Sequence, residues 1–153
     1  MSVIGDKFLA RPCPYEQKTA ALLDWIEDIR GAIKNIREDI KGLTKGQFLD
    51  DGKSQRAVAK SVSDIGEAAH RIMDLAPGIA QRNPEIWKHF VGVYRSRNIL
   101  VHDYFLIDAA IVWDTIENYM PQLEALLDTV VFDDDAGEEG SGGDVAGGTP
   151  PKQ

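Results

Sequence analysis

The sequence has a single cysteine, Cys13, among its 153 residues. One thiol excludes an intramolecular disulfide, and Cys13 lies between two prolines with no nearby histidine to share a metal. No apolar run approaches the roughly 20 residues that a membrane span requires, and no segment resembles a signal peptide. No segment keeps the two-residue alternation of a half-buried strand either. These absences predict a cytoplasmic, all-α protein without a membrane partner.

Charge is distributed unevenly along the chain. The formal net charge is −8, but six of the 25 acidic residues and one of the 17 basic residues fall in residues 132–153. Residues 1–131 therefore hold 19 acidic and 16 basic residues, a net charge of −3. We expect an N-terminal extension over residues 1–14, one folded domain over 15–131 and a disordered, acidic, glycine-rich tail over 132–153. This charge argues against broad binding of nucleic acid but allows a small basic cleft.

Hydrophobic periodicity predicts long amphipathic helices. From Leu22 to Ile40 the large aliphatic residues alternate in steps of four and three, which places them on one stripe of a helix that ends near Gly42. A second helix is predicted over 54–75, before Pro77. The residues predicted to face inward there are Val58, Val62, Ile65, Ala69, Ile72 and Met73. Residues 44–52 are expected to form a loop or a short helix.

Two more helices are predicted in the second half of the chain. Pro84 is expected to open one that runs towards Leu100, and Asp108 is a candidate N-cap for another that ends near Asp128, with Pro121 inside it. The predicted buried side of the last helix is formed by Ile111, Ile116, Met120, Leu123 and Leu127. The economical architecture is an antiparallel, up-and-down bundle of four or five helices.

The segment 97–104 carries the chemistry expected of a phosphate-handling site. It contains Arg97, Asn98, His102 and Tyr104 around an apolar turn. Arginine offers a planar fork of donors that matches phosphoryl oxygens, and histidine accepts and gives protons near neutral pH. Neither residue requires a metal or cofactor for this chemistry.

Helix geometry limits how Arg97 and His102 can meet. Five residues of continuous helix place the two side chains roughly 140° apart, whereas Asn98 and His102 are nearly aligned. Two arrangements would solve this. Either the helix ends near Leu100 and a turn brings His102 round, or a second copy of the chain completes the site. A two-fold dimer would place two Arg97 and two His102 at one axis.

The order and spacing of these residues resemble a known family. Arg97, His102 and Tyr104 match the R-x4-H-x-Y motif of the HEPN superfamily, and the chain looks like a HepT toxin over residues 20–127. Other segments that resemble the family in the right order are 65–68, Trp87, 111–113 and 119–121. The resemblance implies a dimeric helical ribonuclease that needs no metal, with Arg97 and His102 of both subunits as catalytic residues and Asn98 and Tyr104 in support.

The resemblance also implies a partner and a mode of control. HepT-like toxins are paired with an MntA-like minimal nucleotidyltransferase antitoxin, which transfers AMP onto the tyrosine matched here by Tyr104, as in a type VII-like toxin–antitoxin system. Bulk and negative charge at that position would repel RNA. The alternative is a non-catalytic helical module that binds a nucleotide or a partner protein through the same cleft.

The sequence allows two interpretations of several charged residues near the motif. Glu67 is either a solvated helix residue or the ion-pair partner of Arg97 or Arg95. Three basic residues of the second helix are read as a solvated face, with contact to an RNA backbone as the alternative, namely Lys53, Arg56 and Lys60. His70 and His89 lack neighbours that suggest a direct role.

Overall fold

A computed structural model describes residues 14–102, 108–130 and 132 of the chain. Within these residues all regular structure is helical, which confirms the predicted all-α class. The long helices are α1 (Pro14–Asp39), α3 (Gly52–Leu75), α5 (Pro84–His102) and α6 (Ala109–Leu127). Two short helices connect them, α2 (Lys45–Asp50) and α4 (Ile79–Arg82). No helix in the described part of the chain is long and apolar enough to cross a membrane.

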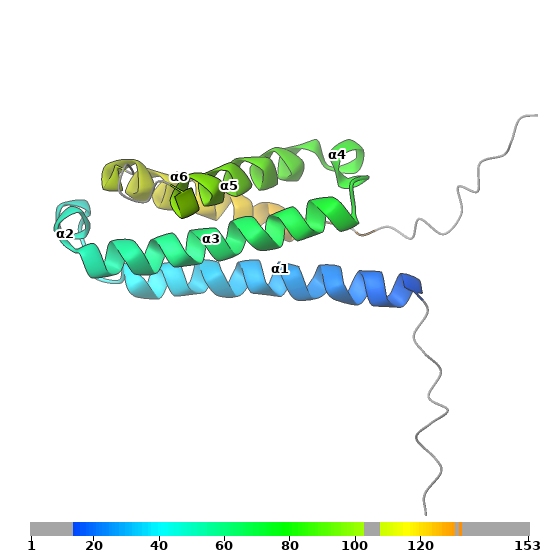
Figure 1. Ribbon diagram of the computed structural model, residues 1–153, viewed down its shortest axis with the longest axis horizontal. Coiled ribbons are helices and arrows are strands. Elements are labelled where there is room, and N and C mark those ends of the chain that lie inside the picture. Colours follow the sequence, from blue (N-terminus) through cyan, green and yellow to red (C-terminus); the bar gives the residue numbers. More distant parts are fainter. Residues whose placement is uncertain (1–13, 103–107, 131, 133–153) are drawn as a thin grey trace, which may run out of the picture.

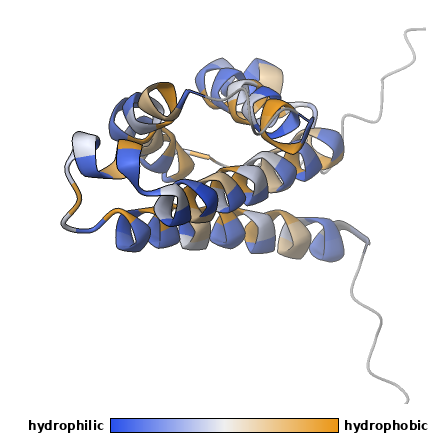
Figure 2. Ribbon diagram, turned by 60° about the vertical axis from the view of Figure 1, so that its left-hand side comes forward, coloured by the Kyte–Doolittle hydropathy of each residue, from blue (hydrophilic) through white to orange (hydrophobic). Residues whose placement is uncertain are grey.

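The helix α3 lies at the centre of the bundle. It packs against α1 on one side and against α5 on the other, and α6 completes the bundle with contacts to α1, α2 and α5 (Figure 1). Hydrophobic residues lie between the helices and hydrophilic residues colour their outer sides (Figure 2). The predicted inward residues of α3 are all buried, and the stripe of α1 is buried from Leu22 to Ile36. The helix α3 therefore provides the buried surface against which α1 and α5 pack.

Local signals set most of the helix ends. Gly42 adopts φ +78°, a left-handed conformation that favours glycine, just after α1. The side chain of Thr44 accepts a hydrogen bond from the Gln47 backbone, and the Gln47 side chain accepts one from the Thr44 backbone, which forms a capping box at the start of α2. Asp108 caps α6 as predicted, because its carboxylate accepts a hydrogen bond of 2.8 Å from the Ala110 backbone.

The structure corrects two details of the predicted bundle. The short helix α4 was not expected, because four residues after Pro77 give too little periodicity to reveal a helix. Ile111 was predicted to be buried, but its side chain is 64% exposed, whereas the other four residues predicted on that side of α6 are buried. Ile111 lies in the first turn of α6, next to the end of α5, where no described helix covers it.

A close contact joins α5 and α6 through Tyr119. The Tyr119 hydroxyl donates a hydrogen bond to the backbone carbonyl of His89, and its ring stacks on the His89 ring with centroids 4.7 Å apart. Gly92 leaves room for this hydroxyl, because a Cβ there would lie 2.6 Å from it. Burial raises the pKa of Tyr119 to about 12, so the phenol stays protonated and keeps donating. His89 therefore has a structural place, as expected.

Candidate active site at the seam of α3 and α5

The motif residues described by the structure lie on α5. Arg97, Asn98 and His102 belong to one continuous helix, of which His102 is the last residue. Of the two predicted arrangements, the one in which the helix ends near Leu100 and a turn brings His102 towards Arg97 is therefore wrong. The helix continues to His102 because no glycine or proline interrupts residues 97–102. Tyr104 lies outside the described residues.

Arg97 is held in place by its neighbours. Its Nη1 donates a hydrogen bond of 3.0 Å to the Asn98 side-chain oxygen, and its Nη2 lies 3.3 Å from a carboxylate oxygen of Glu67 on α3. The Tyr94 ring lies beneath the guanidinium, with 6.0 Å between the ring centroid and Cζ. Both Nη atoms carry a second proton that these contacts do not use. Arg97 thus has a fixed orientation and, among the described residues, donors that remain available.

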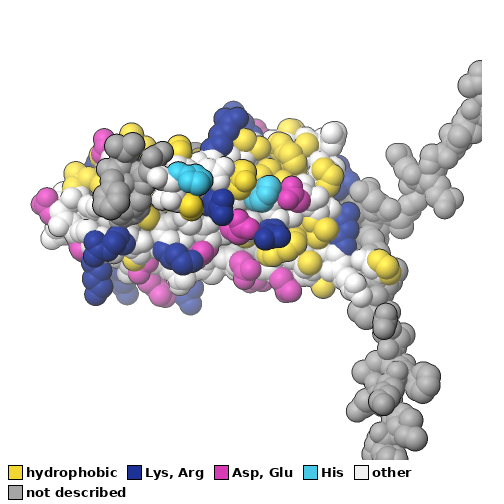
Figure 3. Space-filling model, in the orientation of Figure 1, with side chains coloured by type: hydrophobic (Ala, Val, Ile, Leu, Met, Phe, Trp, Pro, Cys, Tyr) yellow, Lys and Arg dark blue, Asp and Glu magenta, His cyan; other side chains and the backbone are white. Residues whose placement is uncertain are grey.

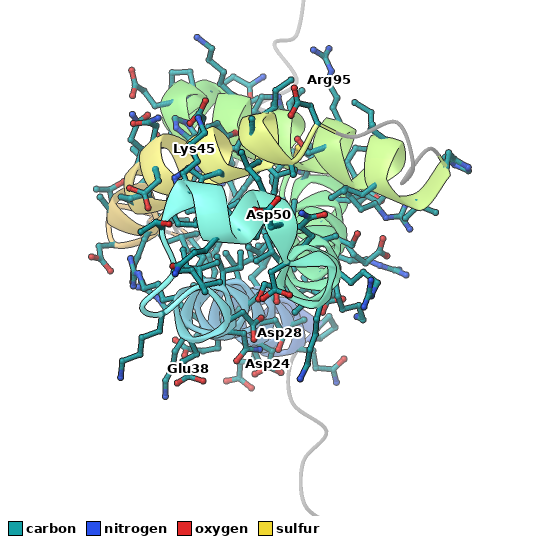
Figure 4. All side chains as sticks on the ribbon, turned by 90° about the vertical axis from the view of Figure 1, so that its left-hand side faces the viewer. Asp24, Asp28, Glu38, Lys45, Asp50 and Arg95 are labelled. Carbon is teal, nitrogen blue, oxygen red and sulfur yellow. The ribbon has the colours of Figure 1, made fainter. Side chains whose placement is uncertain are left out.

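The ion pair with Glu67 decides between two readings of the sequence. Glu67 was predicted either to be solvated or to pair with Arg97 or Arg95, and the structure pairs it with Arg97. Arg95 points away from the bundle (Figure 4). The same carboxylate accepts a hydrogen bond of 3.0 Å from Nε of Arg71, one turn further along α3. Glu67 therefore holds two guanidinium groups.

Gly66 brings α3 and α5 together at this point. A Cβ on Gly66 would lie 2.4 Å from Cβ of Arg97 and 2.9 Å from the backbone oxygen of Val93. Such distances are shorter than packed carbon atoms allow. The absence of a side chain at residue 66 thus sets the helix spacing that allows Glu67 to reach Arg97.

His102 presents a different environment. Its side chain is exposed, and it lies about 7.5 Å along the axis of α5 from Arg97. The helix face around it runs from Arg97 through Val101 and Asn98 to His102 and Ile99, an arc of roughly 200°. Val101 and Ile99 on this arc are each 55% exposed. A single chain therefore leaves His102 between uncovered apolar side chains.

An apolar groove lies beside this arc. It has a volume of about 270 Å³ between α3, the end of α5 and the start of α6. Its lining includes Val62, Ser96, Ile99, Leu100, Ile111 and Val112. Ile99 and Ile111, which line this groove, are 55% and 64% exposed, so the groove leaves apolar side chains in contact with solvent.

The sequence did not reveal a ring pair next to Arg97. The His70 ring stacks on the Tyr94 ring with centroids 4.3 Å apart and an interplanar angle of 11°. Histidine, basic and acidic side chains gather over the seam between α3 and α5 on this face (Figure 3). Helical spacing contained a signal, because Tyr94 precedes Arg97 by three residues and His70 follows Glu67 by three. This spacing was not sufficient to predict the ring pair, because the spacing of residues along one helix does not show which face of another helix they contact.

Comparison with known proteins identifies the class. Residues 29–130 match the family model described as ribonuclease HepT-like. A protein of Methanocaldococcus jannaschii, named as a candidate RNase, is 31% identical over 118 residues, which cover 76% of this chain and 93% of the relative. The protein named "Probable ribonuclease HepT" of Thermococcus cleftensis is 34% identical over 102 residues, which cover 66% of this chain and 87% of the relative. No solved structure gives a match. The chain belongs to the HepT-like ribonuclease family.

Proposed function

We propose that this chain is the toxin of a toxin–antitoxin pair and acts as a metal-independent endoribonuclease. The observation that carries the proposal is the exposed arc of α5, on which Arg97 is held by Glu67 and Asn98 while His102 remains open to solvent. Membership of a ribonuclease family supports the assignment of RNA as the substrate. Arg97 and His102 are the proposed catalytic residues.

Arg97 and His102 suit the cleavage of RNA through its own 2′-hydroxyl. His102 accepts the 2′-hydroxyl proton as the 2′-oxygen attacks the adjacent phosphorus. Arg97 stabilises the negative charge that builds up on the phosphoryl oxygens. The His102 imidazolium formed in this way gives the proton to the 5′-oxygen as the phosphorus–oxygen bond breaks. The products are a 2′,3′-cyclic phosphate and a 5′-hydroxyl.

A homodimer would bring Arg97 and His102 side chains close enough to bind the same phosphate. Within one helix Arg97 and His102 lie too far apart around the axis to grip one phosphate. The exposed side chains of Ile99, Val101 and Ile111 beside the motif provide apolar surface for a second copy to cover. A two-fold contact there would place the Arg97 and His102 side chains of both subunits around one cleft.

The test of this proposal is RNA cleavage by the purified chain. We expect it to cut single-stranded RNA in the presence of EDTA and to leave cyclic phosphate ends. Expression of the chain in bacteria should arrest growth, and Arg97→Ala or His102→Ala should abolish the arrest. A chain that binds nucleotides or a partner but leaves RNA intact under all these conditions would instead be a non-catalytic binding module.

The proposed partner is an MntA-like nucleotidyltransferase that acts as the antitoxin. We expect it to transfer AMP from ATP to the Tyr104 hydroxyl with release of pyrophosphate. Because Tyr104 follows His102 by two residues, the added phosphate should repel RNA from the active site. Incubation with the transferase and ATP should raise the mass of the wild-type chain by one AMP but leave Tyr104→Phe unchanged. No mass increase, or modification of another residue, would contradict this form of control.

A further inference from the structure

The seam of α3 and α5 continues past Arg97, on the side away from His102, with residues that the catalytic proposal does not use. We infer that Arg71 and the His70–Tyr94 ring pair form a subsite for the nucleotide next to the scissile phosphate. Arg71 binds that nucleotide's phosphate, and the rings contact its base. The inference rests on the proposed ribonuclease function and extends it to a second residue of the RNA.

The first support is the way in which Glu67 links the two arginines. One carboxylate oxygen faces Arg97 and the other accepts the hydrogen bond from Arg71, so both guanidinium groups are fixed to the same side chain. Arg71 uses only Nε for this contact, and its side chain is 60% exposed. Among the described residues its two Nη groups have no partner, so they can form the paired hydrogen bonds that arginine makes to a phosphate.

The second support is the aromatic pair, which lies next to both arginines. Tyr94 lies one turn before Arg97 on α5, and His70 immediately precedes Arg71 on α3. The His70 side chain is 34% exposed, and Asp74 holds its Nε2 at 3.3 Å. Cations beside aromatic rings are the usual elements of sites for single-stranded RNA, where the rings stack on bases of any identity.

These positions give the RNA a direction across the molecule. Along α5 the order is His102, Arg97 and then Tyr94, and on α3 Glu67 is followed by His70 and Arg71. A strand whose scissile phosphate lies at Arg97 would therefore place its neighbouring nucleotide over Arg71 and the ring pair. Basic, acidic and histidine side chains follow this line on one face (Figure 3).

The test compares Arg71→Gln with the wild-type chain on a single-stranded oligoribonucleotide. We expect KM to rise about 10-fold and kcat to stay within about 2-fold, because the lost contact binds substrate and transition state alike. The dependence of log KM on log salt concentration should flatten by about 0.7, the contribution of one phosphate contact in a single strand. Arg71→Lys should give an intermediate KM.

Two controls make the result specific. Lys41→Gln removes the same charge from an exposed residue after α1, at the opposite end of α3, and should leave KM unchanged. A dinucleotide has only the scissile phosphate, so wild-type and Arg71→Gln chains should cleave it with equal kcat/KM. Equal effects of Arg71→Gln and Lys41→Gln, or a fall in kcat at constant KM, would overturn the inference. Failure of the wild-type chain to cleave any RNA would instead overturn the proposed function.

Discussion

Replacement of His102 by alanine should lower the rate of RNA cleavage by about 10²- to 10⁴-fold, the usual contribution of a proton-transferring side chain. Because His102 is exposed at the end of α5, its loss should leave the fold intact. The measurement is kcat on a single-stranded oligoribonucleotide, together with the thermal unfolding midpoint of each variant. A His102→Ala chain that folds normally and still cleaves at the wild-type rate would remove His102 from the mechanism.

Arg97→Ala should lower kcat by about 10²- to 10³-fold, because it removes the donors that meet the developing negative charge. The chain offers a matched control two residues away. Arg95 lies on the same helix and points away from the bundle, so Arg95→Ala removes the same charge without touching the site (Figure 4). Equal losses of activity in Arg95→Ala and Arg97→Ala would show that general positive charge, rather than the position of Arg97, supports cleavage.

Gly66→Ala should damage both stability and activity. The new Cβ would lie 2.4 Å from Cβ of Arg97, an atom fixed to the backbone of α5 that cannot rotate away. The two helices must therefore separate, which we expect to lower the free energy of unfolding by about 1–3 kcal/mol. The separation also pulls Arg97 from Glu67, so kcat should fall at temperatures where the variant is folded.

Gly31→Ala is the control for this change. Gly31 lies within α1 on its exposed face, and a Cβ there would meet no atom within 4 Å. Because alanine favours a helix over glycine by about 1 kcal/mol, this variant should be slightly more stable than the wild-type chain and fully active. Denaturant unfolding and RNA cleavage measure both effects. Equal stability and activity of the two alanine variants would contradict the account of the close contact at Gly66.

The sequence predicted the fold well where one physical signal dominated. The stripe of α1 and the inward face of α3 followed from helical periodicity, and Asp108 was identified as a cap because its carboxylate suits the first turn of a helix. Ile111 was placed wrongly because its burial depends on which elements cover the first turn of α6. That information comes from tertiary packing, which periodicity within one helix does not contain.

The candidate site was predicted only in part for the same reason. Arg97 and His102 were proposed as site residues from their chemistry and spacing, and the sequence allowed either Arg95 or Arg97 as the partner of Glu67. The choice depends on the rotation of α5 against α3, which the contact at Gly66 sets. The ring pair of His70 and Tyr94 also arises from that rotation, so it became visible only in the folded chain.

In the proposed dimer, Arg97 of one subunit and His102 of the other act on the same phosphate. Co-expression of Arg97→Ala and His102→Ala chains with different tags allows purification of the mixed dimer. Its cleavage of RNA is compared with that of each mutant homodimer. The mixed dimer retains one intact Arg97 and one intact His102 on opposite subunits, so we expect it to recover cleavage well above either homodimer. A mixed dimer as inactive as both homodimers would contradict a site shared between subunits.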